Sequence, residues 1–486
     1  MKLCEKEYGK EGKSNGLIQK EKNRGNQEAY MKKEKKKMGV RDAFCWALGT
    51  GGNNMYTTLI GTYLTGYYTD TAGIAVAAIG TMMLFSRIFD GITDIAMGAI
   101  VDKTRTKMGK ARPWILLSAP LFLILLFLTV SVPQGMQENF KLVYAYITYI
   151  LLNCFVNTMY FVAHNALLAR ISLDPNDRMK ATAMSQIVSS ITTLVATIII
   201  NTIIQHVNWS VAGIILGGLI AATILIEFFG TEERVGNSTE SEVQENQNEG
   251  DLKESLSALF KNKYFYILTV AMIMIYIANQ GAQTATFYYV SYVLKDLNWI
   301  TVMMACASLA MFVINLVNPV LVKRYSKRVI AMIGAAVNAA GFLVIAAFGN
   351  GVAVLVLSNL LRGAGIGIMF PCIMAFAADV VDYGDWKFGI RSEGLINSCA
   401  SMGNKIGVGL GAAMVAWILA KGGYDGTKAV QSASAIGAIN FTFIWLSVIL
   451  TVFMVILFGF LDLEKYKDQV QKDLAKRHSR AEENNH

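Results

Sequence analysis

Apolar segments of about twenty residues, separated by short polar breaks, follow one another along most of the 486-residue chain. A helix of that length crosses a hydrocarbon layer of about 30 Å. The pattern predicts an all-α membrane protein with twelve transmembrane helices, at residues 42–68, 76–101, 113–132, 141–170, 179–206, 210–229, 264–294, 298–322, 329–349, 352–380, 392–421 and 436–462.

The longest polar break, residues 230–263, is rich in Glu, Asn, Gln and Ser and is typical of a flexible linker. It separates six predicted helices from another six. We therefore expect an N-terminal six-helix bundle at 40–229, a cytoplasmic linker at 230–263 and a C-terminal six-helix bundle at 264–462. Basic cytoplasmic tails at 1–39 and 463–486 complete the predicted organisation.

Lysine and arginine are distributed unevenly between the two sets of loops. Fourteen lie in the loops that follow the even-numbered helices, against four in the opposite set. Basic residues near helix ends stay on the cytoplasmic side. This bias predicts a multi-pass protein of the cell membrane with both termini in the cytoplasm, as an even number of helices requires.

Composition agrees with this class, because 54% hydrophobic and 16% charged residues with a mean hydropathy of +0.41 are too apolar for a soluble protein of this length. The net charge of +9 belongs mostly to loops and tails, so we expect contact with the lipid bilayer and no nucleic-acid partner. The six cysteines lack ligand-like spacing, and no enzyme motif stands in a suitable context. The sequence thus predicts a monomeric non-enzyme without a cofactor.

Two carboxylates lie within the second predicted helix. Asp90 and Asp94 are one helical turn apart and share a face. A charge at bilayer depth costs roughly 2.5 to 3.5 kcal/mol on insertion scales, so this face must meet water, a cation or a partner. The pair offers hard ligands for Na+ or a shared proton, with Thr93 and Asn157 as further oxygen donors.

A structural reading of the same residues stays open at this point. Asp90 could pair with Arg87, three residues earlier, and Asp94 could belong to the cytoplasmic helix end with Asp102. Lys405, in the eleventh predicted helix, has the same two readings, as a structural counter-ion or as a coupling residue. In either case we expect Lys405 to face a central cavity that it shares with the aspartates.

Amides and aromatic side chains recur inside the predicted helices. Such groups suit a polyhydroxylated ligand, and the alternative is hydrogen bonding between helices, worth about 0.6 kcal/mol each on average. The set is Asn53, Asn54, Asn153, Asn157, Tyr160, His164, Asn165, Gln186, Asn279, Gln280 and Gln283.

Four motifs, in order and at matching spacing, resemble the melibiose permease-like family of glycoside-pentoside-hexuronide:cation symporters. They are GYYTD ending at Asp70, RIFDGITDIAMG at 87–98, RTKMGKARPW at 105–114 and ADVVDYGDWKFGIRSEG at 378–394. The resemblance runs from about Gly39 to Lys465. It implies a major facilitator fold that imports a sugar, glycoside or oligosaccharide with Na+ or H+ by alternating access.

The resemblance also assigns roles to particular residues. The family's cation ligands fall on Asp90, Asp94, Thr93 and Asn157, and its helix 11 lysine on Lys405. Its cytoplasmic gating charges fall on Arg178, Asp379, Asp382, Arg391 and Glu393. The residues expected to line the substrate path are Asn54, Arg87, Tyr160, His164, Gln186, Phe370, Ser401 and Lys405.

The chain departs from the family at the sugar site. Asn54 and Tyr160 stand where the sugar-binding carboxylates are expected, so acceptor-only groups are replaced by an amide and a phenol that also donate. Gln186, His164 and Phe370 replace an arginine and two tryptophans. These changes argue against α-galactoside specificity. The alternatives are a lipid or amphiphile transporter of the same fold and a non-transporting membrane receptor.

Overall fold

The computed structural model describes residues 38–172, 174–234, 261–388, 393–466, 469–470 and 472–473, without the side chains of 175, 319, 320, 323 and 393–400. Most of the predicted linker, and most of both predicted tails, lie outside these ranges. Within them the chain forms twelve helical rods, some interrupted by a π-helical turn. The all-α, twelve-helix prediction is confirmed.

Six rods form the N-terminal half. The first runs through α2 (Val40–Thr58), η1 (Leu59–Tyr63), α3 (Leu64–Gly66) and η2 (Tyr67–Thr71), followed by α4 (Val76–Lys103) and α5 (Arg112–Thr129). The fourth joins α6 (Glu138–Ile150), η3 (Leu151–Asn157) and α7 (Thr158–Ile171), and the last two are α8 (Pro175–His206) and α9 (Trp209–Gly230).

Six more rods form the C-terminal half. They are α12 (Lys263–Tyr289) with η4 (Val290–Leu294), α13 (Asn298–Arg324), α14 (Lys327–Phe348), α15 (Val352–Phe388), α16 (Glu393–Lys421), and α17 (Ala433–Asn440) with η5 (Phe441–Trp445) and α18 (Leu446–Gly459). Among the described residues, eleven helices are long and apolar enough to cross a membrane. The first rod is not among them because three glycines and two asparagines lie in the stretch from Gly49 to Asn54.

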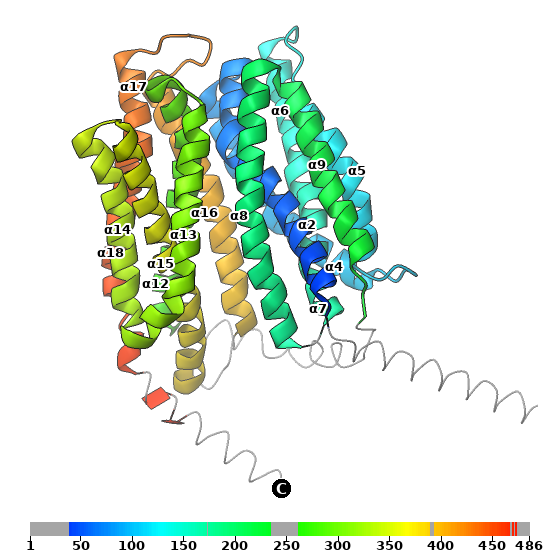
Figure 1. The fold of residues 1–486 in the computed structure, drawn as a ribbon, viewed down its shortest axis with the longest axis vertical. Coiled ribbons are helices and arrows are strands. Elements are labelled where there is room, and N and C mark those ends of the chain that lie inside the picture. Colours follow the sequence, from blue (N-terminus) through cyan, green and yellow to red (C-terminus); the bar gives the residue numbers. More distant parts are fainter. Residues whose placement is uncertain are drawn as a thin grey trace, which may run out of the picture.

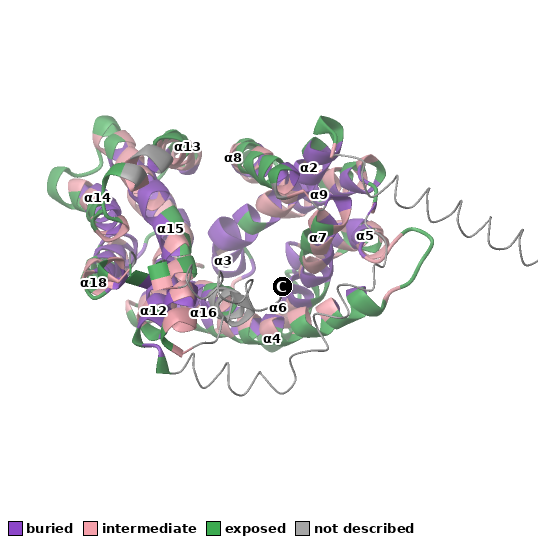
Figure 2. Cartoon of the chain, turned by 90° about the horizontal axis from the view of Figure 1, so that it is seen from below, coloured by how far each residue is buried: buried purple, intermediate pink, exposed green. Residues whose placement is uncertain are grey.

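The two halves stand side by side (Figure 1). In the view from below, α4 and α16 lie together along one edge of the boundary between the halves, and α8 and α13 lie along the other (Figure 2). Close approach of α4 to α16 depends on Gly80, where an added Cβ would lie 2.7 Å from the Ala416 Cβ. Helices from both halves therefore surround the central space.

Polar contacts join the halves at the end of the molecule where η2 and η4 terminate. Asp70 accepts hydrogen bonds from the hydroxyls of Tyr292 and Tyr424 in the opposite half. Asn201 of α8 donates to the Leu297 carbonyl at 3.1 Å and to the Thr301 hydroxyl at 2.7 Å. These contacts close that end across the boundary.

Candidate substrate and cation site

A polar cavity of about 490 Å³ lies between the two halves. Its walls come from α2, η1, α4, α6, η3, α7 and α8 on one side and from α12, α13 and α16 on the other. Its polar lining includes Asn53, Asn54, Thr57, Arg87, Asp90, Asp94, Asn157, Thr158, Asn279, Gln280, Gln283, Ser401, Asn404 and Lys405. This cavity brings together most of the intramembrane charges and amides predicted from the sequence.

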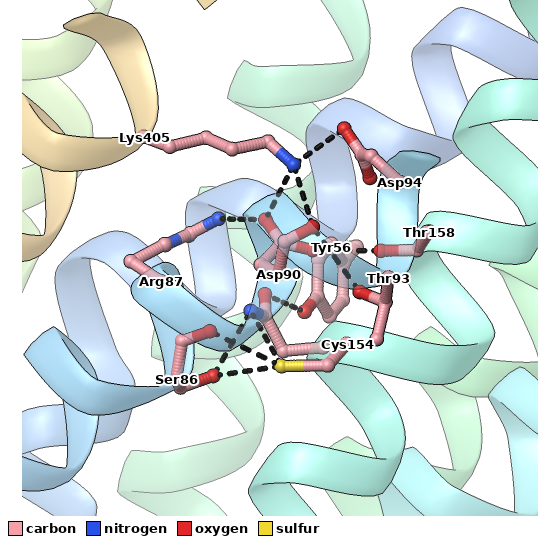
Figure 3. A network of polar contacts seen from close by, with 10 residues as sticks. Tyr56, Ser86, Arg87, Asp90, Thr93, Asp94, Cys154, Thr158 and Lys405 are labelled. Atoms are coloured by element: carbon pink, nitrogen blue, oxygen red, sulfur yellow. Dashed lines mark hydrogen bonds and ion pairs between the residues drawn. The ribbon is translucent and has the colours of Figure 1, made fainter. Parts of the chain in front are cut away.

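Asp90 is buried at the centre of the charged group in this cavity. Its Oδ1 accepts a hydrogen bond from the Thr158 hydroxyl at 2.7 Å. Its Oδ2 lies 3.6 Å from an Arg87 nitrogen and 3.5 Å from the Lys405 Nζ (Figure 3). Pairing with Arg87 thus exists, as the structural reading expects, but Asp90 also faces a cation from the other half of the molecule.

Lys405 connects the halves through both aspartates. Its ammonium is ion-paired with the carboxylate of Asp94 and also donates to the Asp90 backbone carbonyl at 2.8 Å (Figure 3). Asp102 instead contacts Arg170, at 3.3 Å. Asp94 therefore belongs to the central cluster and not to the helix end, and the ammonium occupies the space between two carboxylates.

The neutral oxygen donors predicted beside the aspartates lie in different settings. The amide Oδ1 of Asn157 is buried in the cavity wall without a hydrogen-bond partner, an arrangement that leaves it available to a cation. Thr93 uses its hydroxyl to donate to the Asp90 carbonyl at 3.1 Å and does not line the cavity. The structure therefore favours Asn157 over Thr93 as a cation ligand.

Buried side chains behind the aspartates hold this part of α4 in place. The Tyr56 hydroxyl donates to Asn153 Oδ1 at 2.9 Å, and Asn153 Nδ2 donates to Ser86 at 3.2 Å. Asn153 and Asn157 both lie in η3, and π-helical turns often occur at functional sites. The predicted alternative of interhelical hydrogen bonding thus describes Asn153, while Asn157 faces the cavity.

The residues predicted for the substrate path separate into two groups. Asn54, Arg87, Ser401 and Lys405 line the central cavity. The other four, Tyr160, His164, Gln186 and Phe370, do not line it.

Tyr160 and His164 face away from the cavity toward α9. The Tyr160 hydroxyl donates to one oxygen of Glu227 at 2.7 Å, and His164 Nδ1 lies 2.6 Å from the other. Tyr160 and Glu227 are fully buried, and His164 stacks on Trp46 with 4.6 Å between ring centroids. Tyr160 and His164, which were expected to line the substrate path, therefore contact Glu227 and not the central cavity in this structure.

Glu227 was not foreseen as an intramembrane charge because it lies near the end of an apolar helix. The sequence held one hint of this contact, because Gly49 in the first rod has no side chain and leaves room for the Glu227 carboxylate. A Cβ at position 49 would lie 1.9 Å from Glu227 Oε2. The buried cluster of Tyr160, His164 and Glu227 ties the first, fourth and sixth rods together.

Gln186 and Phe370 have separate surroundings. Gln186 is exposed on α8 and lines neither this cavity nor the neighbouring one. Phe370 lines a second cavity of about 370 Å³, formed mainly by the C-terminal half together with Thr193 of α8. This second cavity shares Tyr276, Asn279 and Gln283 with the central one, so the two adjoin.

Two of the predicted gating charges, Arg178 and Asp379, make contacts within their own half. The Arg178 Nε donates to the Ser172 carbonyl at 2.7 Å, and Asp379 lies 2.7 Å from the Lys327 ammonium. Asp382 lies in α15. Arg391 and the side chain of Glu393 lie outside the described part of the chain.

Comparison with known proteins assigns the sequence to a protein family. Residues 45–465 match the family described as MFS/sugar transport protein. The isoprimeverose transporter of Lactiplantibacillus pentosus is 27% identical, covering 90% of this chain and 92% of that protein. The putative glycoside/cation symporter YagG of Escherichia coli is 31% identical, covering 79% of this chain and 83% of that protein.

Solved structures support the fold. The nucleoside transporter NupG superposes with a TM-score of 0.63 at 18% identity, covering 87% of this chain and 100% of that one. The D-xylose-proton symporter gives a TM-score of 0.61 at 12% identity, covering 86% and 97%. The major facilitator fold predicted from the sequence is therefore confirmed. The family match and the named relatives confirm the resemblance to sugar symporters. The chain belongs to the MFS/sugar transport protein family, whose members are membrane transporters and not enzymes.

Proposed function

We propose that this protein imports a sugar or glycoside together with Na+ or H+ by alternating access. One observation carries the proposal: Lys405 of the C-terminal half occupies a two-carboxylate site of the N-terminal half, inside a cavity lined by amides. Because the Lys405 ammonium of the protein occupies this site between the halves, a cation from solution can compete with it there. The names of the relatives, among them a glycoside/cation symporter, support the same conclusion.

The charges explain how an ion and a conformational change can be coupled. Arg87 and Lys405 together balance Asp90 and Asp94, so a further cation at the carboxylates competes with the Lys405 ammonium. Asn157 Oδ1 would supply a neutral ligand to an incoming Na+. Release of Lys405 removes an ion pair that spans the halves and frees α16 to move relative to α4.

Amides and aromatic rings supply the contacts for a sugar. The buried Asn53 Oδ1 has no hydrogen-bond partner, whereas Gln283 Nε2 donates to Asn279 Oδ1 at 3.1 Å on the wall formed by the other half. Tyr276 and Phe161 present rings to the same space. Amides donate and accept, so they match the hydroxyl groups of a neutral sugar ring.

The orientation predicted from the loops places the closed end at Asp70 outside the cell, so the central cavity belongs to an inward-facing state. We expect Asp70→Asn to loosen this end, because an amide accepts less strongly from the hydroxyls of Tyr292 and Tyr424. The variant should label severalfold faster at a cysteine placed at Asn53, when the reagent is applied from outside. Asp425→Asn, in the adjacent exposed loop, is the control. Equal labelling of both variants would contradict an external closure at Asp70.

Binding and transport can be tested on the purified protein. A ligand that binds the folded state raises its unfolding temperature, so a thermal-shift screen of mono-, di- and oligosaccharides with and without Na+ should yield a stabilising sugar. In proteoliposomes that sugar should accumulate only when a Na+ or H+ gradient is imposed. A sugar that binds without any ion-driven uptake would indicate a receptor. Stabilisation by lysolipids alone would indicate an amphiphile transporter.

A further inference from the structure

The second cavity contains a charge that the proposed symport mechanism does not use. It lies mainly among α12, α13, α14 and α15, with Thr193 of α8 and Met454 of α18 also in its wall. Its lining is mainly apolar and includes Met311, Ile366 and Phe370. Arg362 of α15 also lines it. This cavity shares Tyr276 with the central one, so the two adjoin.

In the residues that the structure describes, the hydrogen-bond and ring contacts of Arg362 are with neutral groups. One guanidinium nitrogen donates to Asn359 Oδ1 at 2.8 Å, and the guanidinium carbon lies 4.2 Å and 5.2 Å from the ring centroids of Phe342 and Phe443. Its Nε is buried and has no hydrogen-bond partner. In the described part of the chain, no carboxylate lies within ion-pairing distance of it.

Two other arginines each have a carboxylate partner. Arg87 faces Asp90 at 3.6 Å, and the largely buried Arg234 lies 2.6 Å from Asp42. An uncompensated buried cation is costly, and aromatic rings offset only part of that cost. A guanidinium also presents its donors as a planar fork that fits carboxylate, sulfonate or phosphate oxygens. Arg362 therefore presents donors to the second cavity that an oxyanion of a ligand would fit.

We propose that the second cavity is a subsite for a negatively charged group on the transported glycoside, with Arg362 as its ligand. This inference rests on the proposed function, because it places the sugar ring among the amides of the central cavity. Asn359 is a positioning residue for Arg362. Its Nδ2 donates to the Leu355 carbonyl at 2.8 Å, which keeps the amide oxygen toward the guanidinium.

Matched ligands test the charge directly. The probes are 4-nitrophenyl β-D-glucoside as the neutral member, 4-nitrophenyl β-D-glucuronide with the anion on the sugar, and 4-carboxyphenyl β-D-glucoside with the anion on the aglycone. We expect at least one anionic probe to bind the wild-type protein about tenfold more tightly than its neutral counterpart. Whichever anionic probe binds more tightly identifies where on the ligand the charge lies.

Two substitutions and one control distinguish loss of the Arg362 charge from loss of the folded state. Arg362→Gln should lose the preference for the anion, whereas Arg362→Lys should keep part of it because the charge remains. Arg112→Gln is the matched control, since Arg112 also stacks on a ring, that of Phe228 at 4.5 Å, but lines neither cavity. Retained binding of the neutral glucoside shows that a variant is folded.

The outcomes distinguish this proposal from the broader one. If neither anionic probe binds more tightly than the neutral glucoside, or if Arg362→Gln keeps the preference, the subsite is disproved. Ion-driven uptake of a neutral sugar would leave the symport proposal intact in that case. Failure of every sugar to show ion-driven uptake would instead disprove the symport, whatever Arg362 binds.

Discussion

Asp94→Asn abolishes uphill sugar uptake and leaves the protein folded. The substitution removes the carboxylate that pairs with Lys405 and, by our proposal, one of the two charged ligands of the coupling ion. A membrane potential of 100 mV is worth about 2.3 kcal/mol per charge, or roughly fiftyfold accumulation by the wild-type protein. The variant should reach an inside-to-outside ratio of about one, measured in proteoliposomes with the sugar that gives the largest thermal shift.

The control for this prediction lies on the same helix. Asp102 is at the end of α4 and its side chain is two-thirds exposed, so Asp102→Asn removes an equal charge without touching the cavity. This variant should accumulate sugar like the wild type. Concentrative uptake by Asp94→Asn at the wild-type level would exclude Asp94 from coupling. An equal loss in both variants would assign the effect to the charge of α4 in general.

The second large effect concerns stability. Glu227→Ala removes the acceptor of the Tyr160 hydroxyl and the partner of His164, both buried. Loss of one member of a buried charged network costs about 3 kcal/mol, because the remaining groups stay desolvated and unpaired. The expected result is a clearly lowered unfolding temperature of the purified protein, with the yield of folded protein reduced as well.

Two further variants distinguish the effect of breaking the contacts of Glu227 with Tyr160 and His164 from the effect of removing a carboxylate in general. Glu227→Gln preserves the volume and one acceptor oxygen, so its unfolding temperature should fall between those of the wild type and the alanine variant. Glu138→Ala, on the exposed first turn of α6, should leave stability unchanged. A wild-type unfolding temperature for Glu227→Ala would show that the cluster does not stabilise the N-terminal half.

Helix number and approximate position could be read from the sequence because each rod needs a long apolar run, and such runs are local. The ends of the helices were harder to predict from the sequence. Helix α15 continues to Phe388, beyond the predicted end at 380, because the polar residues after Ala378 extend the helix past the apolar stretch. The first rod was predicted correctly although its amides and glycines make it the least apolar.

Residues of the site were predictable where spacing along one helix determines the answer. Asp90 and Asp94 share a face of α4, and an unpaired Lys405 needed a carboxylate at similar depth. The fourth rod was different, because spacing places Tyr160 and His164 on a common face without indicating which neighbour that face meets. Only the packing of α9 against the first and fourth rods brings Glu227 to them.

The position of Lys405 has a consequence for any measurement of ion affinity. An ammonium attached to α16 is a competitor at high local concentration, since it cannot diffuse away from the carboxylates. The affinity that a titration reports is then the intrinsic affinity of the site, reduced by the fraction of molecules in which the lysine already fills it. Every ion that binds must compete with the Lys405 ammonium, so selectivity between ions is measured relative to that cation. How strongly the ammonium competes depends on how closely the two halves approach.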